Sequence, residues 1–115
     1  MKTAVSSNWH TMIDARSREL HELIAQKIRQ NPALIQKVRE TLTRWLRVTD
    51  EGDRSHDALI EWQRRLERDS LDIVLDFLVS DGEEACRLRQ STPFVGLLTE
   101  RERGEIFRKY EAYRS

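Results

Sequence analysis

The sequence is poor in the residues that make tight turns and cross-links. It has 4 glycines, 2 prolines and 1 cysteine among 115 residues. Because β-hairpins depend on glycine and other turn residues, this supply disfavours an all-β fold. The single cysteine, Cys86, leaves no intrachain disulfide, so we expect a structural thiol in a cytoplasmic protein.

The sequence also lacks long apolar runs and the residues of cofactor sites. No stretch approaches the roughly twenty apolar residues that span a membrane, and residues 1–30 show no signal-peptide pattern. The histidines His10, His21 and His56 stand far apart, and no glycine-rich phosphate loop occurs. We therefore expect no membrane association, no metal and no cofactor.

Charged residues, in contrast, are plentiful and unevenly placed. They make up 35% of the chain, which is typical of amphipathic helices with solvated outer faces. Residues 1–48 hold nine Lys and Arg against four Asp and Glu, a net charge of +5, and the remainder carries −5. This asymmetry indicates a basic surface near the N-terminus, although salt bridges between the helices would explain it as well.

Residues 71–79 are the only stretch that is apolar on nearly every side, reading Leu-Asp-Ile-Val-Leu-Asp-Phe-Leu-Val. Asp72 and Asp76 are four residues apart, as the single solvated edge of a helix requires, so a helix is favoured over a buried strand. We predict an all-α protein, a single compact helical bundle of about five to six helices around this central apolar helix. It forms one domain over residues 1–115.

Amphipathic stripes and capping residues predict where the helices begin. The predicted starts are Ser6 or Ser7, Asn31-Pro32, Ser55, Asp69 or Ser70, Ser80 with Glu83, and Thr99 with Glu102. Trp45 and Phe107 belong to stripes that face inward. Arg16 and Lys27 fall within the apolar stripe of the first helix, so either their stems reach out to solvent or this stripe is partly an interface.

The sharpest enzymatic pattern is Arg16 followed five residues later by His21. It resembles the Arg-x4-6-His motif of HEPN-type ribonucleases, which implies a histidine that assists 2′-hydroxyl attack and an arginine that holds phosphate. Five residues along a helix place the two side chains about 140° apart, so a shared site would need a second subunit. The alternative is that His21 is a surface residue beside Glu22.

Basic faces on two predicted helices suggest a helical nucleic-acid-binding transcriptional regulator as another alternative. These faces consist of Lys37, Arg44, Arg47, Arg64, Arg65 and Arg68. Acidic residues interrupt both stripes, and Asn31-Pro32 lacks the short glycine-containing turn usual in a helix-turn-helix. A net charge of zero argues against strong nonspecific affinity, so we do not expect nucleic acid as a partner.

A resemblance to a known family covers most of the chain. It rests on residues 14–21 (Asp-Ala-Arg-Ser-Arg-Glu-Leu-His), 23–25 (Leu-Ile-Ala), 28–34 (Ile-Arg-Gln-Asn-Pro-Ala-Leu), 61–62 (Glu-Trp), 88–94 (Leu-Arg-Gln-Ser-Thr-Pro-Phe) and 97–102 (Leu-Leu-Thr-Glu-Arg-Glu). These segments resemble small all-helical bacterial antitoxins, or chaperone-like partners, encoded beside toxins such as zeta-type nucleotide kinases. The resemblance implies a protein that is not an enzyme and that neutralises a cognate protein toxin by occluding its active site.

Under this resemblance, arginine and aromatic side chains are the candidate contacts, because they are often binding hot spots. The partner-binding residues that we predict are Trp9, Arg16, Arg18, Arg87, Arg89 and Phe94. For Trp9 and Phe94 the alternative is a place in the hydrophobic core. The identity of the toxin and homodimerisation stay open.

Overall fold

The computed structural model describes the backbone of residues 2–111 and the side chains of residues 11–111. This range holds six α-helices and two short 3-10 helices: α1 (Lys2–Gln30), η1 (Pro32–Leu34), α2 (Ile35–Val48), α3 (Arg54–Arg68), α4 (Leu71–Leu78), α5 (Glu83–Arg89), η2 (Val95–Leu97) and α6 (Glu100–Glu111). The described residues form no strand, which confirms the all-α prediction. Between residues 2 and 111, no helix has both the length and the hydropathy needed to cross a membrane.

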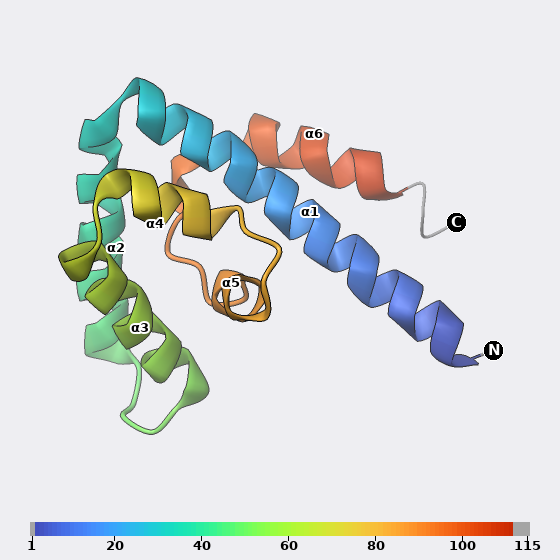
Figure 1. The fold of residues 1–115 in the computed structure, drawn as a ribbon, viewed down its shortest axis with the longest axis horizontal. Coiled ribbons are helices and arrows are strands. Elements are labelled where there is room, and N and C mark those ends of the chain that lie inside the picture. The colour runs from blue at the N-terminus through green and yellow to red at the C-terminus, as the bar shows by residue number, and fades with distance from the viewer. Residues whose placement is uncertain (1, 112–115) are drawn as a thin grey trace.

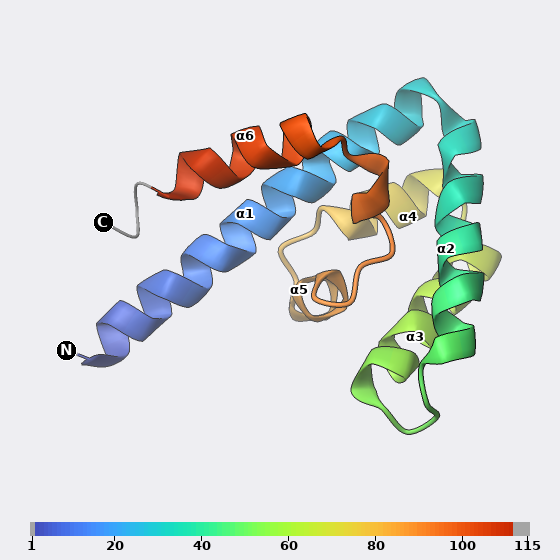
Figure 2. The same ribbon diagram turned by 180° about the vertical axis from the view of Figure 1, so that it is seen from behind.

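The longest helix, α1, organises the others, which gather around its C-terminal half (Figures 1 and 2). The chain bends sharply at Asn31, and α2 and α3 then form an antiparallel pair. Next, α4 packs on α1, and α6 runs back along α1 in the opposite direction. The N-terminal half of α1 consequently extends beyond the α2 to α5 part of the molecule.

The core centres on Trp62 of α3, which is fully buried. Its ring packs edge-on against Phe77, with centroids 5.7 Å apart, and against Phe94 at 5.2 Å. Its indole Nε1 donates a hydrogen bond to the Leu88 carbonyl at 2.9 Å. Since both the ring and its one polar atom find partners, this residue joins α3, α4, α5 and the segment after α5.

The apolar helix α4 is buried on one side only. Leu75 and Leu78 are fully buried, whereas Ile73 is 55% exposed. The solvated edge is therefore wider than the predicted pair of Asp72 and Asp76. The physical reason is that α1, α3 and α5 pack against α4 from its inner side and leave the outer side open.

Hydrogen bonds confirm two of the predicted helix starts. The Thr99 hydroxyl accepts the Glu102 backbone N–H at 3.0 Å, and the Glu102 carboxylate accepts the Thr99 N–H at 2.8 Å. These two bonds form the expected capping box. At the start of α4, Ser70 Oγ accepts the Ile73 N–H at 3.4 Å.

The start predicted at Asn31-Pro32 is correct, because Asn31 is the N-cap residue of η1 and Pro32 is its first residue, although the Asn31 side chain makes no capping hydrogen bond. Three other predicted starts are wrong. Ser6 and Ser7 lie within α1, and Ser55 lies within α3, where Asp53 is the N-cap and accepts the Ser55 N–H at 3.3 Å. The N-cap residue of the fifth helix is Gly82. Ser80 does not cap this helix, because its Oγ accepts the Gly82 N–H at 3.1 Å in the turn that precedes the helix.

Replacing Trp62 with alanine should lower the free energy of unfolding by about 3–5 kcal/mol, because it empties the centre of the core and unpairs the Leu88 carbonyl. Urea unfolding followed by circular dichroism measures this loss. The matched control is Trp45→Ala. Trp45, predicted to face inward, is in fact 37% exposed, so its loss should cost about 1 kcal/mol or less. Equal losses in the two variants would contradict this placement of the core.

Candidate functional site

A groove of about 270 Å³ lies on the flank of α1, bordered by α5, the segment that follows it, and α6. Its lining combines apolar and polar side chains, among them Ile13, Val95, Phe107, Arg16, His21 and Arg89. Three of the polar residues were singled out in the sequence. The groove therefore contains Arg16, His21 and Arg89, three of the candidate functional residues.

His21 is 1% exposed, and both of its ring nitrogens have partners. Nδ1 lies 2.6 Å from the Ser17 carbonyl oxygen, and Nε2 lies 2.8 Å from Thr92 Oγ1. Because a carbonyl only accepts, Nδ1 carries the hydrogen and the Thr92 hydroxyl donates to Nε2. Thr92 Oγ1 also accepts the Phe94 N–H at 3.1 Å. His21 thus ties the segment after α5 to α1.

Burial lowers the pKa of His21 from 6.5 to about 4, and the positive charge of Arg89 acts in the same direction. The ring is therefore neutral at pH 7. The expectation of a surface histidine beside Glu22 is wrong. A base that deprotonates a ribose hydroxyl needs a free lone pair, and Nε2 already uses its lone pair on Thr92. This geometry does not favour the ribonuclease interpretation.

Arg16 lies on the α6 side of the groove. Its guanidinium carbon is 4.2 Å from the centroid of the Phe107 ring, a cation–π contact. Phe107, predicted to face inward, is 37% exposed. Arg16 and His21 line one groove of a single chain.

Arg89 is the second arginine of the groove and is only 4% exposed. Its Nη1 donates to the carbonyl oxygens of Leu78 at 2.9 Å and Ser80 at 2.6 Å, and its Nη2 lies 3.3 Å from Cys86 Sγ. The carbonyls lie at the C-terminal end of α4, where the helix dipole favours a cation. Within residues 11–111 no carboxylate pairs with Arg89, and its buried Nε–H has no hydrogen-bond partner.

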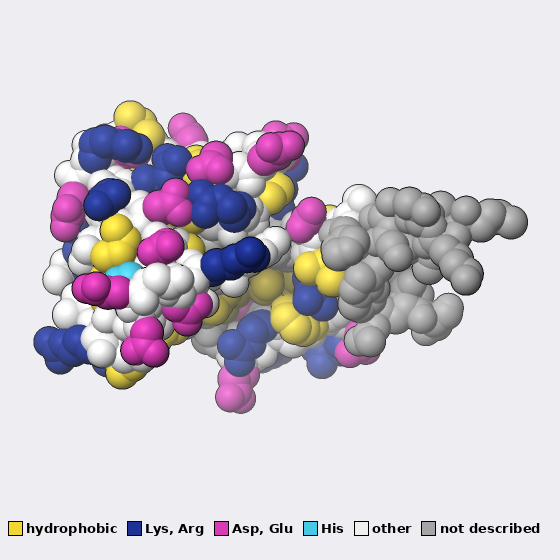
Figure 3. Space-filling model, turned by 90° about the horizontal axis from the view of Figure 1, so that it is seen from below, with side chains coloured by type: hydrophobic (Ala, Val, Ile, Leu, Met, Phe, Trp, Pro, Cys, Tyr) yellow, Lys and Arg dark blue, Asp and Glu magenta, His cyan; other side chains and the backbone are white. Residues whose placement is uncertain are grey.

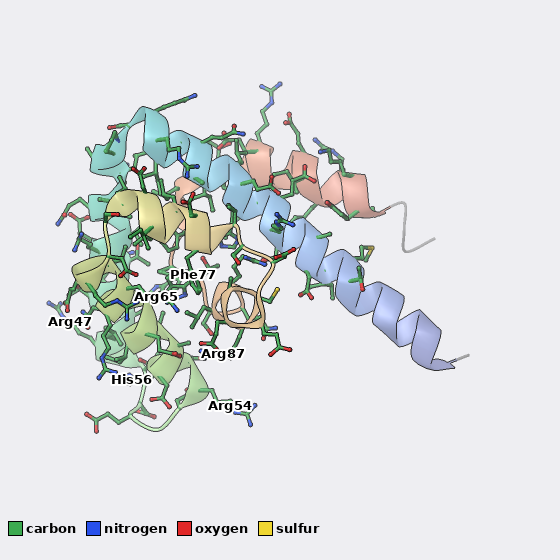
Figure 4. The ribbon with its side chains drawn as sticks, viewed as in Figure 1. Arg47, Arg54, His56, Arg65, Phe77 and Arg87 are labelled. Carbon is green, nitrogen blue, oxygen red and sulfur yellow. The ribbon has the colours of Figure 1, made fainter. Side chains whose placement is uncertain are left out.

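Two other predicted partner-binding arginines are engaged within the chain. Arg18 Nε donates to the Val79 carbonyl at 2.8 Å. Arg87 reaches from α5 toward α3 (Figure 4), where both Glu61 oxygens accept from it at 2.9 Å and Glu84 accepts at 2.8 Å. This arginine holds the pKa of Glu61 below its usual range. Arg87 therefore already has its charge neutralised by two carboxylates.

The remaining predicted residues differ in their accessibility. Phe94 is fully buried in the core against Trp62, so a partner would not reach it. Arg89 is buried and is one of the residues that line the groove. Trp9 lies on α1, but its side chain is outside the described residues. Of the six predicted residues, the groove brings together Arg16 and Arg89.

Basic side chains do not gather into a continuous patch on the face shown in Figure 3, where Lys and Arg alternate with Asp and Glu. Arg65 lies against Phe77, with its guanidinium carbon 3.6 Å from the ring centroid (Figure 4). Arg68 pairs with Asp69 at 2.8 Å. Two of the three arginines of the basic face predicted on α3 are thus engaged in contacts within the chain.

No protein-family model, no curated protein and no solved structure matches this chain. Among the described side chains, no three of His, Cys, Asp or Glu come together as a metal site would require. The groove and helix α1 are therefore the candidate functional features of the described chain.

The folded protein should lose stability as the pH falls from about 6.5 to 4, because the unfolded chain then protonates His21 while the folded chain keeps it neutral. We expect the free energy of unfolding to fall by about 2–3 kcal/mol between pH 7.5 and 4.5 from this residue alone. Urea unfolding at several pH values measures the slope. His21→Gln should remove this part of the slope, and an unchanged slope in the variant would contradict the buried neutral ring.

Proposed function

We propose that this chain is an antitoxin-like protein that binds a cognate protein toxin and blocks its active site. The observation that carries the proposal is the N-terminal half of α1, which extends beyond the α2 to α5 part of the molecule (Figures 1 and 2). A helix presented in this way can lay one face into a groove of another protein.

The flank of α1 adds a second contact area for the toxin. Arg16 and Phe107 are both partly exposed there and lie against one another. Arginine and aromatic side chains are enriched among binding hot spots. Their mutual contact restrains both side chains before binding, which reduces the conformational entropy lost on association.

Occlusion requires no chemistry from the chain itself. A helix seated in the substrate cleft of a toxin would exclude nucleotide or RNA, and a nucleotide kinase is the toxin that the resemblance suggests. The proposal includes a cytoplasmic location, where the free thiol of Cys86 stays reduced. Neither the ribonuclease nor the transcriptional regulator has a specific observation in its favour.

Coexpression with the protein encoded beside it should suppress that protein's toxicity, and the two should copurify. Trp9→Ala and Arg16→Glu should each weaken the complex by about 30-fold, or about 2 kcal/mol, because each removes a hot-spot side chain from α1. Isothermal titration calorimetry on the purified proteins measures the affinities.

The matched controls for this test are Trp45→Ala and Arg47→Glu, which change the same residue types on the exposed end of α2. They should leave the affinity unchanged. The proposal fails if the α1 variants bind as tightly as the parent chain, or if the α2 variants alone lose binding.

A further inference from the structure

We infer that the groove receives an acidic side chain of the partner, whose carboxylate lies between Arg16 and Arg89. The inference rests on the proposed function in taking the ligand from a partner protein. The charge and geometry behind it belong to this chain alone.

Arg89 has N–H groups that donate to no oxygen or nitrogen acceptor among the described residues. A guanidinium carries five N–H groups. Nη1 uses both of its hydrogens on the carbonyls of Leu78 and Ser80, whereas Nη2 has only the weak acceptor Cys86 Sγ and Nε–H has none. The Nε and Nη2 hydrogens lie along one edge of the guanidinium, an edge that can bind a carboxylate in a bidentate manner.

The side chain of Cys86 covers this edge. Cys86 Sγ lies 3.3 Å from Nη2, and Cys86 is a half-buried residue that also lines the groove. Rotation of its side chain to another staggered rotamer would open the edge to a ligand. A carboxylate placed there would supply the counter-charge that a buried arginine otherwise lacks.

Arg16 places a second cation in the lining of the groove, beside α6. It stacks on Phe107 and forms no ion pair with any described residue. Among the described side chains, Asp14 is the only carboxylate that lines the groove, and it pairs with neither arginine. His21 is neutral at pH 7 and adds no charge. Two arginines against one aspartate leave the groove with a net positive charge.

The walls of the groove indicate which chemical groups the ligand carries beside its carboxylate. Ile13, Leu20, Val95 and the Phe107 ring are apolar. An inorganic anion would leave these walls unfilled, whereas an acidic side chain beside an apolar residue would satisfy both the walls and the arginines. The occupant that fits is therefore a short acidic and apolar segment of the partner.

A small carboxylate tests this inference on the chain alone. The probe is 3-phenylpropionate, and its control is the neutral 3-phenylpropionamide, which has the same shape. Titration of the 15N-labelled chain should shift the amide signals of Ser17, Gln90 and Val95, with a dissociation constant of about a few millimolar for a fragment of this size. The amide should bind at least about tenfold more weakly.

Variants locate the bound carboxylate. Arg16→Gln and Arg89→Gln should each weaken 3-phenylpropionate binding at least about tenfold. Because Arg89→Gln also removes the hydrogen bonds at the end of α4, Arg16→Gln keeps the test decisive if the other variant does not fold. Arg101→Gln, which changes an exposed arginine of α6 outside the groove, should leave binding unchanged.

Equal binding of the acid and the amide, or unchanged binding by Arg16→Gln, would overturn the inference. Preferential binding of inorganic phosphate at the same signals would overturn the assignment to an acidic side chain. None of these measurements uses the partner, so their failure is distinct from failure of the proposed function, which is measured on the toxin complex and its α1 and α2 variants.

Discussion

The structure depends on Arg89, a buried arginine that pairs with no carboxylate among the described side chains. Arg89 reaches from α5 to two carbonyls at the end of α4 and fixes the angle between these helices. Helices of eight and seven residues are not stable alone, so tertiary contacts of this kind determine where they lie. The segment that follows α5 is positioned in turn, with Phe94 against Trp62 and Thr92 against His21.

Two of the residues that line the groove are held in place by hydrogen bonds to the folded backbone. His21 and Arg89 line the groove on one side and are hydrogen-bonded to the backbone on the other. A ligand would therefore meet side chains that are already ordered, which lowers the entropic cost of binding. The same burial that keeps His21 neutral leaves the two arginines as the cations of the groove. One helix, α1, thus serves both the core and the surface that we assign to the partner.

Local patterns in the sequence were sufficient to predict an all-α fold and the starts of some helices, whereas the site depends on distant contacts. Thr99 and Glu102 cap α6 through a spacing of three residues, which a sequence displays directly. His21 is buried by Thr92, a residue 71 positions away, and no local signal marks that contact. Arg89 was predicted as a partner contact because arginine is often a binding hot spot. Arg89 is buried because it binds the carbonyls of Leu78 and Ser80, which lie close to it only in the folded chain.

We infer that Arg16 of α1 and Arg89 of α5 together form a receptor for a carboxylate of the partner. A crystal structure of the complex with the toxin tests it most directly. We predict an aspartate or glutamate of the toxin in the groove, with a carboxylate oxygen about 2.7–2.9 Å from the guanidinium nitrogens of Arg16 or Arg89. A toxin seated on α2 and α3, with only water in the groove, would contradict the claim.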